Sequence, residues 1–158
     1  MGIYYNAALR GIKNAVKLID SIEDNTMFNQ VSDELHDSLL SIVHFVGDVY
    51  PRVKNSNCYL SLPVEEKNFL LAFIYLNNQL KHDTSLDIIY FEVCGSMFPL
   101  SFPMRFGPPG VYWAVFEDHG RSREAKREHY ETNLMDRDIR STLTHLEELL
   151  LRINNQTT

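Results

Sequence analysis

The sequence predicts a mainly α-helical fold, a four-helix bundle with a small antiparallel β-insert between the third and fourth helices. Four long segments repeat apolar residues at three- and four-residue steps, which is the period of a helix with one buried face. Residues 87–116 instead carry short β-branched and aromatic runs separated by turns that contain Gly and Pro, a pattern typical of strands. The chain has 158 residues, 44% of them hydrophobic, which suits one domain with a single core.

The first two predicted helices cover residues 5–23 and about 27–50. The apolar face of the first consists of Tyr5, Leu9, Ile12, Val16, Ile19 and Ile22. The apolar face of the second consists of Phe28, Val31, Leu35, Leu39, Ile42 and Val46. Polar residues 24–26 separate the two helices and offer capping side chains. Pro51 is expected to end the second helix, because proline disfavours helical geometry at the residue before it, and residues 52–62 are expected to form a polar connection.

The third predicted helix opens at residues 61–63 and continues to Lys81 or His82. Glu65 and Glu66 occupy its first turn, where negative charge complements the helix dipole. One apolar stripe consists of Phe69, Phe73, Leu76 and Leu80, and the opposite side carries Leu71 and Tyr75. A helix that is apolar nearly all round is buried centrally or packs against two partners.

The β-insert at about 87–116 is predicted to be a three-stranded antiparallel meander, with an irregular or edge position for its middle stretch, which contains Pro99 and Pro103. Its aromatic residues, Tyr112 and Trp113 among them, either stack bases or cover the helices, and core packing is favoured. A last helix is predicted over 121–153, with a core stripe of Ile139, Leu143, Leu146, Leu150 and Ile153. Residues 1–153 then form a single domain and 154–158 a disordered tail.

Composition excludes several classes of protein. The net charge of -6, from 15 Lys and Arg against 21 Asp and Glu, argues against broad attraction to phosphate backbones, although a small basic patch is compatible with it. The sequence contains no signal-peptide pattern and no apolar stretch long enough to span a membrane. Cys58 and Cys94 lack metal-ligand spacing, which favours a reducing, cytoplasmic location. Nucleotide-binding glycine motifs are absent as well, so no cofactor is predicted.

The second helix is acidic. Between residues 18 and 51 there are seven Asp and Glu and no Lys or Arg, so any RNA is expected to approach from another side of the protein. Asp33, His36 and Asp37 have a spacing at which they could share a divalent ion. Helical-bundle metal sites combine several such clusters, and no second Asp/Glu-x-x-His pattern occurs, so the sequence predicts no metal site.

Polar residues end the second face of the third helix. Asn78 and His82 lie one turn apart, on the face that Leu71 and Tyr75 continue toward the N-terminus. A polar pair at the end of an apolar face predicts a dimer interface that opens into a cleft.

Residues 77–83, NNQLKHD, resemble the HEPN family, small α-helical proteins of prokaryotic defence and toxin systems. The family motif is an Arg, then a polar residue that is often Asn, then a His four residues after that Asn. Asn78 and His82 match the last two positions, whereas Asn77 occupies the position of the arginine. The resemblance covers mainly the third helix. It implies a homodimer through Leu71, Tyr75, Asn78 and His82, in which paired motifs cleave RNA without a metal.

The resemblance implies roles for individual residues. His82 is the expected acid/base group, Asn77 and Asn78 position the phosphate, and Lys81 is a candidate cation. A basic run is a second source of cations for the substrate, or else an ordinary solvated helix face, and it contains Arg121, Arg123, Lys126 and Arg127.

Two functions follow from these roles. The first is an RNA-binding protein or metal-independent endoribonuclease of a phage-defence or toxin–antitoxin system. The alternative is a catalytically inactive dimeric helical module that binds a protein or a nucleotide. Asn77 in place of the arginine and the net charge of -6 favour the alternative, whereas the intact spacing from Asn78 to His82 favours the first.

Overall fold

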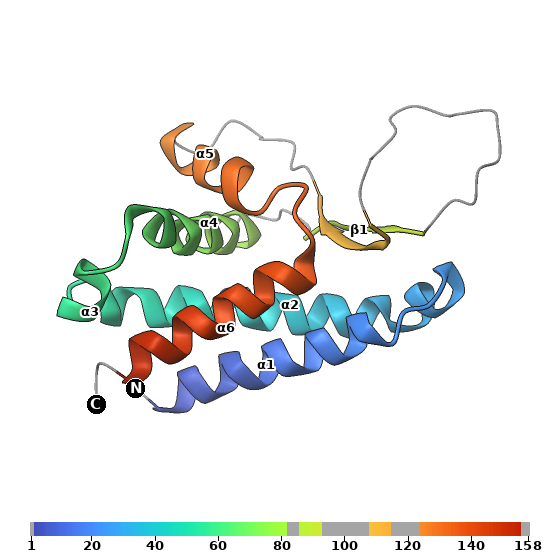
Figure 1. Cartoon of the computed structure of the whole chain (residues 1–158), viewed down its shortest axis with the longest axis horizontal. Coiled ribbons are helices and arrows are strands. Elements are labelled where there is room, and N and C mark those ends of the chain that lie inside the picture. The colour runs from blue at the N-terminus through green and yellow to red at the C-terminus, as the bar shows by residue number, and fades with distance from the viewer. Residues whose placement is uncertain (1, 82–85, 93–107, 115–123, 156–158) are drawn as a thin grey trace.

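The computed structural model describes residues 2–81, 86–92, 108–114 and 124–155, without the side chains of 2–4 and 124–126. This part of the chain contains six helices and one two-stranded sheet (Figure 1). Their bounds are α1 Gly2–Asp20, α2 Asn25–Val53, α3 Asn57–Leu60, α4 Val64–Leu80, β1 Ile88–Phe91, β2 Gly110–Trp113, α5 Glu124–Asn133 and α6 Ile139–Asn155. The predicted class, mainly helical with a small antiparallel sheet, is confirmed. None of the helices within the described ranges is long and apolar enough to cross a membrane.

Helices α1 and α2 correspond to the first two helices that the apolar periodicity predicts, and they pack against each other as a hairpin. The carboxylate of Asp24 accepts a hydrogen bond of 2.8 Å from the backbone N–H of Met27 and caps the start of α2. The prediction that Pro51 ends α2 is wrong, because the helix continues to Val53 with Pro51 in its last turn. Proline there removes only the hydrogen bond to the carbonyl of Gly47, and burial of Val53 keeps the final turn helical.

The short helix α3 lies in the segment that was expected to be a polar connection. The hydroxyl of Ser56 accepts a hydrogen bond of 3.2 Å from the backbone N–H of Tyr59 and caps this single turn. The turn buries Cys58 and Tyr59, so the thiol of Cys58 is inside the core.

The sheet pairs β1 with β2 in antiparallel register, with Ile88 opposite Trp113 and Phe91 opposite Gly110. The predicted meander is therefore wrong in its order, because the first and last of its three runs are direct neighbours. The middle run, at 97–102, lies outside the described residues. Trp113 is fully buried and Tyr112 is 8% exposed, which confirms that these two aromatic residues cover the helices.

The predicted single helix over 121–153 is two helices, α5 and α6, separated by a turn. Asp136 has a φ of 61°, the left-handed conformation that Asp tolerates better than most residues. The backbone of Trp113 holds the turn from outside: its carbonyl accepts from the N–H of Asp136 and its N–H donates to the carbonyl of Arg137, each over 3.1 Å. The break therefore depends on β2, which is distant in sequence.

Helix α6 starts with a side-chain cap, which can be tested. The carboxylate of Asp138 accepts from the backbone N–H of Ser141 at 2.7 Å and from its hydroxyl at 2.6 Å. Replacing Asp138 with alanine is expected to lower the free energy of unfolding by about 1 kcal/mol, measured by urea denaturation. Asp138→Asn keeps an acceptor oxygen and is expected to stay close to wild type. Equal stabilities for the alanine variant and the wild type would contradict the capping role.

Helix α6 joins the two sides of the molecule (Figure 1). It contacts α1, where Arg140 pairs with Asp20 at 2.6 Å, and it reaches α4, where Arg152 pairs with Glu66 at 2.6 Å. The helix continues through Asn155, so the predicted tail at 154–158 begins too early. Helix α4 itself packs against α2 and α5, which confirms the prediction that it contacts two partners.

Candidate functional site

The residues singled out at the end of α4 lie in different environments. The side chain of Asn77 is 4% exposed and faces α2, Asn78 is half-buried, and Lys81 is exposed. Lys81 occupies the position four residues after Asn77, hence on the same side of α4. His82 follows directly in the sequence and lies outside the described residues.

Asn77 is hydrogen-bonded to a residue of α2. The Nδ1 atom of His44 lies 2.8 Å from the Oδ1 atom of Asn77, and because an amide oxygen only accepts, Nδ1 carries the proton and donates. His44 is exposed, whereas its partner is buried. The buried amide therefore fixes an imidazole that stands at the surface.

A glycine allows this approach between the helices. A Cβ atom at position 47 would lie 2.7 Å from the Cγ of Asn77, and closer still to its Nδ2. Real Cβ atoms do not approach other heavy atoms so closely. Gly47 therefore provides the space in which the side chain of Asn77 lies across α2 and reaches His44.

The position of Asn77 corrects one expectation. A direct phosphate contact requires an accessible amide, but the amide of Asn77 is buried and its carbonyl oxygen is bonded to His44. The reason is its place on α4, next to the fully buried Leu76 on the face that packs against α2. Asn77 thus acts on the surface only through His44.

The predicted dimer face is also corrected. Tyr75 is 3% exposed, and its ring lies 5.9 Å from the ring of Tyr130 on α5 of the same chain. Leu71 and Asn78 on that face are half-buried. Because the chain breaks at 134–138, α5 folds back over α4 and covers the surface that a single long helix would have left open.

The side chain of Tyr130 links the contact between α4 and α5 to the end of β2. The hydroxyl of Tyr130 donates a hydrogen bond of 2.7 Å to the carbonyl of Ala114. Burial raises the pKa of Tyr130 well above its usual range, and Tyr75 and Asp87 raise it further. The phenol consequently remains a protonated donor at neutral pH, and the face of α4 beneath it stays closed.

The basic run is described only in part. Arg121 and Arg123 lie outside the described residues, and for Lys126 the structure describes the backbone in α5 alone. Arg127 forms an ion pair with Glu131 one turn later on α5. That pair matches the interpretation of the run as a solvated helix face with intrahelical ion pairs.

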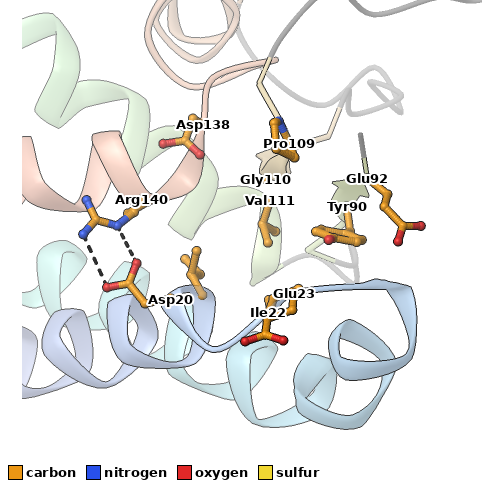
Figure 2. A pocket seen from close by; sticks show the side chains of 11 residues that line it. Asp20, Ile22, Glu23, Tyr90, Glu92, Pro109, Gly110, Val111, Asp138 and Arg140 are labelled. Atoms are coloured by element: carbon orange, nitrogen blue, oxygen red, sulfur yellow. Dashed lines mark hydrogen bonds and ion pairs between the residues drawn. The ribbon is translucent and has the colours of Figure 1, made fainter. Parts of the chain in front are cut away.

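A pocket of about 490 Å³ lies between the end of α1, the sheet and the start of α6 (Figure 2). Its charged lining consists of Asp20, Glu23, Glu92, Asp138 and Arg140. Figure 2 shows Arg140 turned toward Asp20, to which it is hydrogen-bonded over 2.6 and 3.3 Å. With its cation already paired and the carboxylates in excess, the pocket repels phosphate groups, so it is not a place where RNA would bind.

The possible metal cluster on α2 is not formed. Within the described ranges, no three His, Cys, Asp or Glu side chains are grouped so that they could hold a metal ion, and this includes Asp33, His36 and Asp37. The Nε2 atom of His36 lies 2.7 Å from the carbonyl oxygen of Leu86. That imidazole therefore ties α2 to the chain just before β1.

His44 is the residue of this site that the sequence patterns do not single out. Its only local signal is Gly47 three residues later, inside the apolar face of a helix, which indicates a close approach of another backbone or side chain. Comparison of the chain with protein-family models, with curated proteins and with solved structures found no match. The resemblance to HEPN proteins therefore depends on the motif at residues 77–83.

Proposed function

We propose that the chain is a HEPN-like RNA-binding protein that cleaves RNA without a metal, at the surface where the end of α4 meets α2. One observation carries the proposal: an exposed imidazole, that of His44, is held by a buried amide on the helix whose sequence resembles the family motif. In this proposal α1, α2, α4 and α6 are the four bundle helices, and the protein is cytoplasmic. A homodimer in this proposal uses a surface that α5 does not cover.

The chemistry requires a base, a source of protons and a cation. The 2′-hydroxyl oxygen attacks the adjacent phosphorus, the bond from phosphorus to the 5′ oxygen breaks, and the products are a 2′,3′-cyclic phosphate and a 5′-hydroxyl. Imidazole suits the proton transfers because its charge changes near neutral pH. Lys81 is exposed and supplies positive charge for the phosphate. His82, the next residue, keeps the acid/base role that the resemblance implies, as the source of the proton that the 5′ oxygen takes up.

The direct test is an RNA cleavage assay in EDTA. Wild-type protein is incubated with structured and unstructured RNA beside His82→Ala and a matched control, His129→Ala, which changes a half-buried histidine on α5. The His82 variant is expected to lose about 100-fold or more of the cleavage rate, the usual contribution of an acid/base group, and the control is expected to lose none. Equal background cleavage by the wild type and the His82 variant would refute the ribonuclease.

The charge distribution favours a second candidate, a catalytically inactive module that binds a protein. Four of the five charged residues that line the pocket are acidic, and the net charge is -6. A surface of this kind attracts a basic partner and repels nucleic acid. If this candidate is right, the purified protein binds no RNA in a gel mobility-shift assay, even at about 50 mM salt, where electrostatic binding is strong. The ribonuclease is expected to bind RNA under the same conditions.

A further inference from the structure

We infer that His44 is the base that takes the 2′-hydroxyl proton, and that Asn77 and Gly47 are positioning residues that hold it. This inference rests on the proposed function and assigns the proton transfer to a residue of α2 that lies outside the family motif. It also gives the asparagine at the arginine position a role that a buried residue can perform.

The hydrogen bond determines which ring nitrogen is available. Since Nδ1 of His44 donates to Asn77, the neutral ring carries its lone pair on Nε2. His44 is exposed, so its ring can be reached from solvent, whereas the amide behind it is 4% exposed and shielded from competing water. A buried group that fixes the tautomer and orientation of an imidazole is the usual support of a histidine base.

The other described histidines are placed differently. The Nε2 atom of His36 is bonded to the carbonyl of Leu86, and the ring of His145 packs edge-on against Phe69 at 4.6 Å. His129 is half-buried on α5. Among the histidines that the structure describes, His44 therefore combines exposure with a side-chain hydrogen bond that selects the tautomer.

Exposed charged residues of both signs lie on the two helices that meet at His44. Asp48 is exposed one turn later on α2, and Asp37 is exposed about two turns earlier. Lys81 is exposed at the end of α4, four residues after Asn77 and therefore on the same side of that helix. An ammonium group at this surface stabilises the negative charge of the phosphate.

The proposed cleavage reaction involves proton transfers and one exchange of bonds at phosphorus. Nε2 of His44 accepts the proton of the 2′-hydroxyl as its oxygen bonds to phosphorus, and the 5′ oxygen leaves with the bonding pair and takes up a proton from the acid that the proposed function assigns. The imidazolium of His44 then returns its proton to water. No oxidation or reduction occurs, and the ring is regenerated in the same tautomer because Asn77 keeps its acceptor.

The experiment compares single-turnover RNA cleavage by wild type, His44→Gln, His44→Ala and the control His129→Ala. Glutamine can still donate a hydrogen bond to Asn77, so that variant keeps the helix contact but cannot transfer protons. Both His44 variants are expected to lose about 100-fold or more in rate with similar RNA binding. Added imidazole is expected to restore part of the rate to His44→Ala, since the missing ring was exposed, and not to change the rate of the control.

Asn77 is tested separately, with a readout that a purely structural role would not change. Nitrogen chemical shifts of the neutral His44 ring are expected to report the Nδ1–H tautomer in wild type and a mixture in Asn77→Ala. The rate of Asn77→Ala is expected to fall about 10- to 100-fold, and Asn77→Asp, which keeps the acceptor, is expected to recover most of it.

The outcomes separate the two claims. If the wild type cleaves RNA and His44→Gln cleaves equally fast, the inference is refuted and the proposed function remains. If the wild type cleaves no RNA, the proposed function is refuted and the catalytic role of His44 with it. An Nε2–H tautomer in the wild type would overturn the inference whatever the cleavage assay shows.

Discussion

Replacing Trp113 with alanine is expected to lower the free energy of unfolding by about 4 kcal/mol, the range seen when a large buried aromatic is truncated. The side chain is fully buried, its ring meets Phe73 edge-on at 6.0 Å, and its Nε1–H donates a hydrogen bond of 2.8 Å to the hydroxyl of Thr142. Truncation removes the ring contact and leaves Thr142 without this donor. It also loosens the strand whose backbone holds the turn at Asp136.

The measurement is urea denaturation followed by far-UV circular dichroism, because the chain contains a single Trp and the variant loses that fluorescence. Leu151→Ala, at a position 40% exposed on α6, is the matched control and is expected to cost about 0.5 kcal/mol or less. A loss below 1 kcal/mol for the Trp113 variant would show that the ring does not hold β2 to α4 and α6. Hydrogen exchange of the Asp136 amide should accelerate in the same variant.

Replacing Gly47 with alanine is expected to destabilise the protein by about 3 kcal/mol. The new methyl group would overlap the side chain of Asn77, and overpacking of this kind costs about 1–3 kcal/mol. Displacing Asn77 also breaks its hydrogen bond to His44 and leaves the buried amide oxygen unpaired, which adds about 1–3 kcal/mol. Better helix propensity recovers only about 1 kcal/mol of this sum.

A double-mutant cycle tests the cause. Since Asn77→Ala removes the group that the methyl would strike, Gly47→Ala is expected to cost at least about 1 kcal/mol less in that background than in the wild type. Gly11→Ala is the matched control, because its Cβ would meet the side chain of Ile42 at 3.0 Å rather than a fixed amide. Additive effects of the Gly47 and Asn77 substitutions would show that the two residues do not compete for the same space.

Apolar periodicity predicts the helices well where one face is buried along the whole element. Helices α1, α2 and α4 lie within a few residues of their predicted bounds because local spacing and capping side chains determine them. The sequence does not predict the break between α5 and α6, because the backbone of Trp113, more than 20 residues earlier, holds this turn. Its one local signal is Asp138, which begins the apolar stripe at Ile139 as a capping residue.

In the candidate site too, the sequence predicts the local features but not the contacts between residues that are distant in the chain. The polar end of α4 is evident from the sequence, and so is the exposed cation at Lys81. The sequence does not predict the partner of Asn77, because His44 is 33 residues away on another helix and no local spacing connects the two. The side chain of Asn77 can lie toward α2 because Gly47 has no side chain. A pattern of apolar residues carries no information about this space.

The bridge that α6 makes between α1 and α4 has a consequence for how the protein is made. Arg140 and Asp20 are 120 positions apart, so the contact of α1 with α6 forms only after most of the chain has left the ribosome. Until then the faces of α1 and α4 that α6 covers, with Phe69 among their residues, remain open to chaperones and to other nascent chains. Synthesis that stalls before residue 139 would therefore leave the preceding helices and strands with an uncovered apolar side, a substrate for quality control rather than a smaller stable domain.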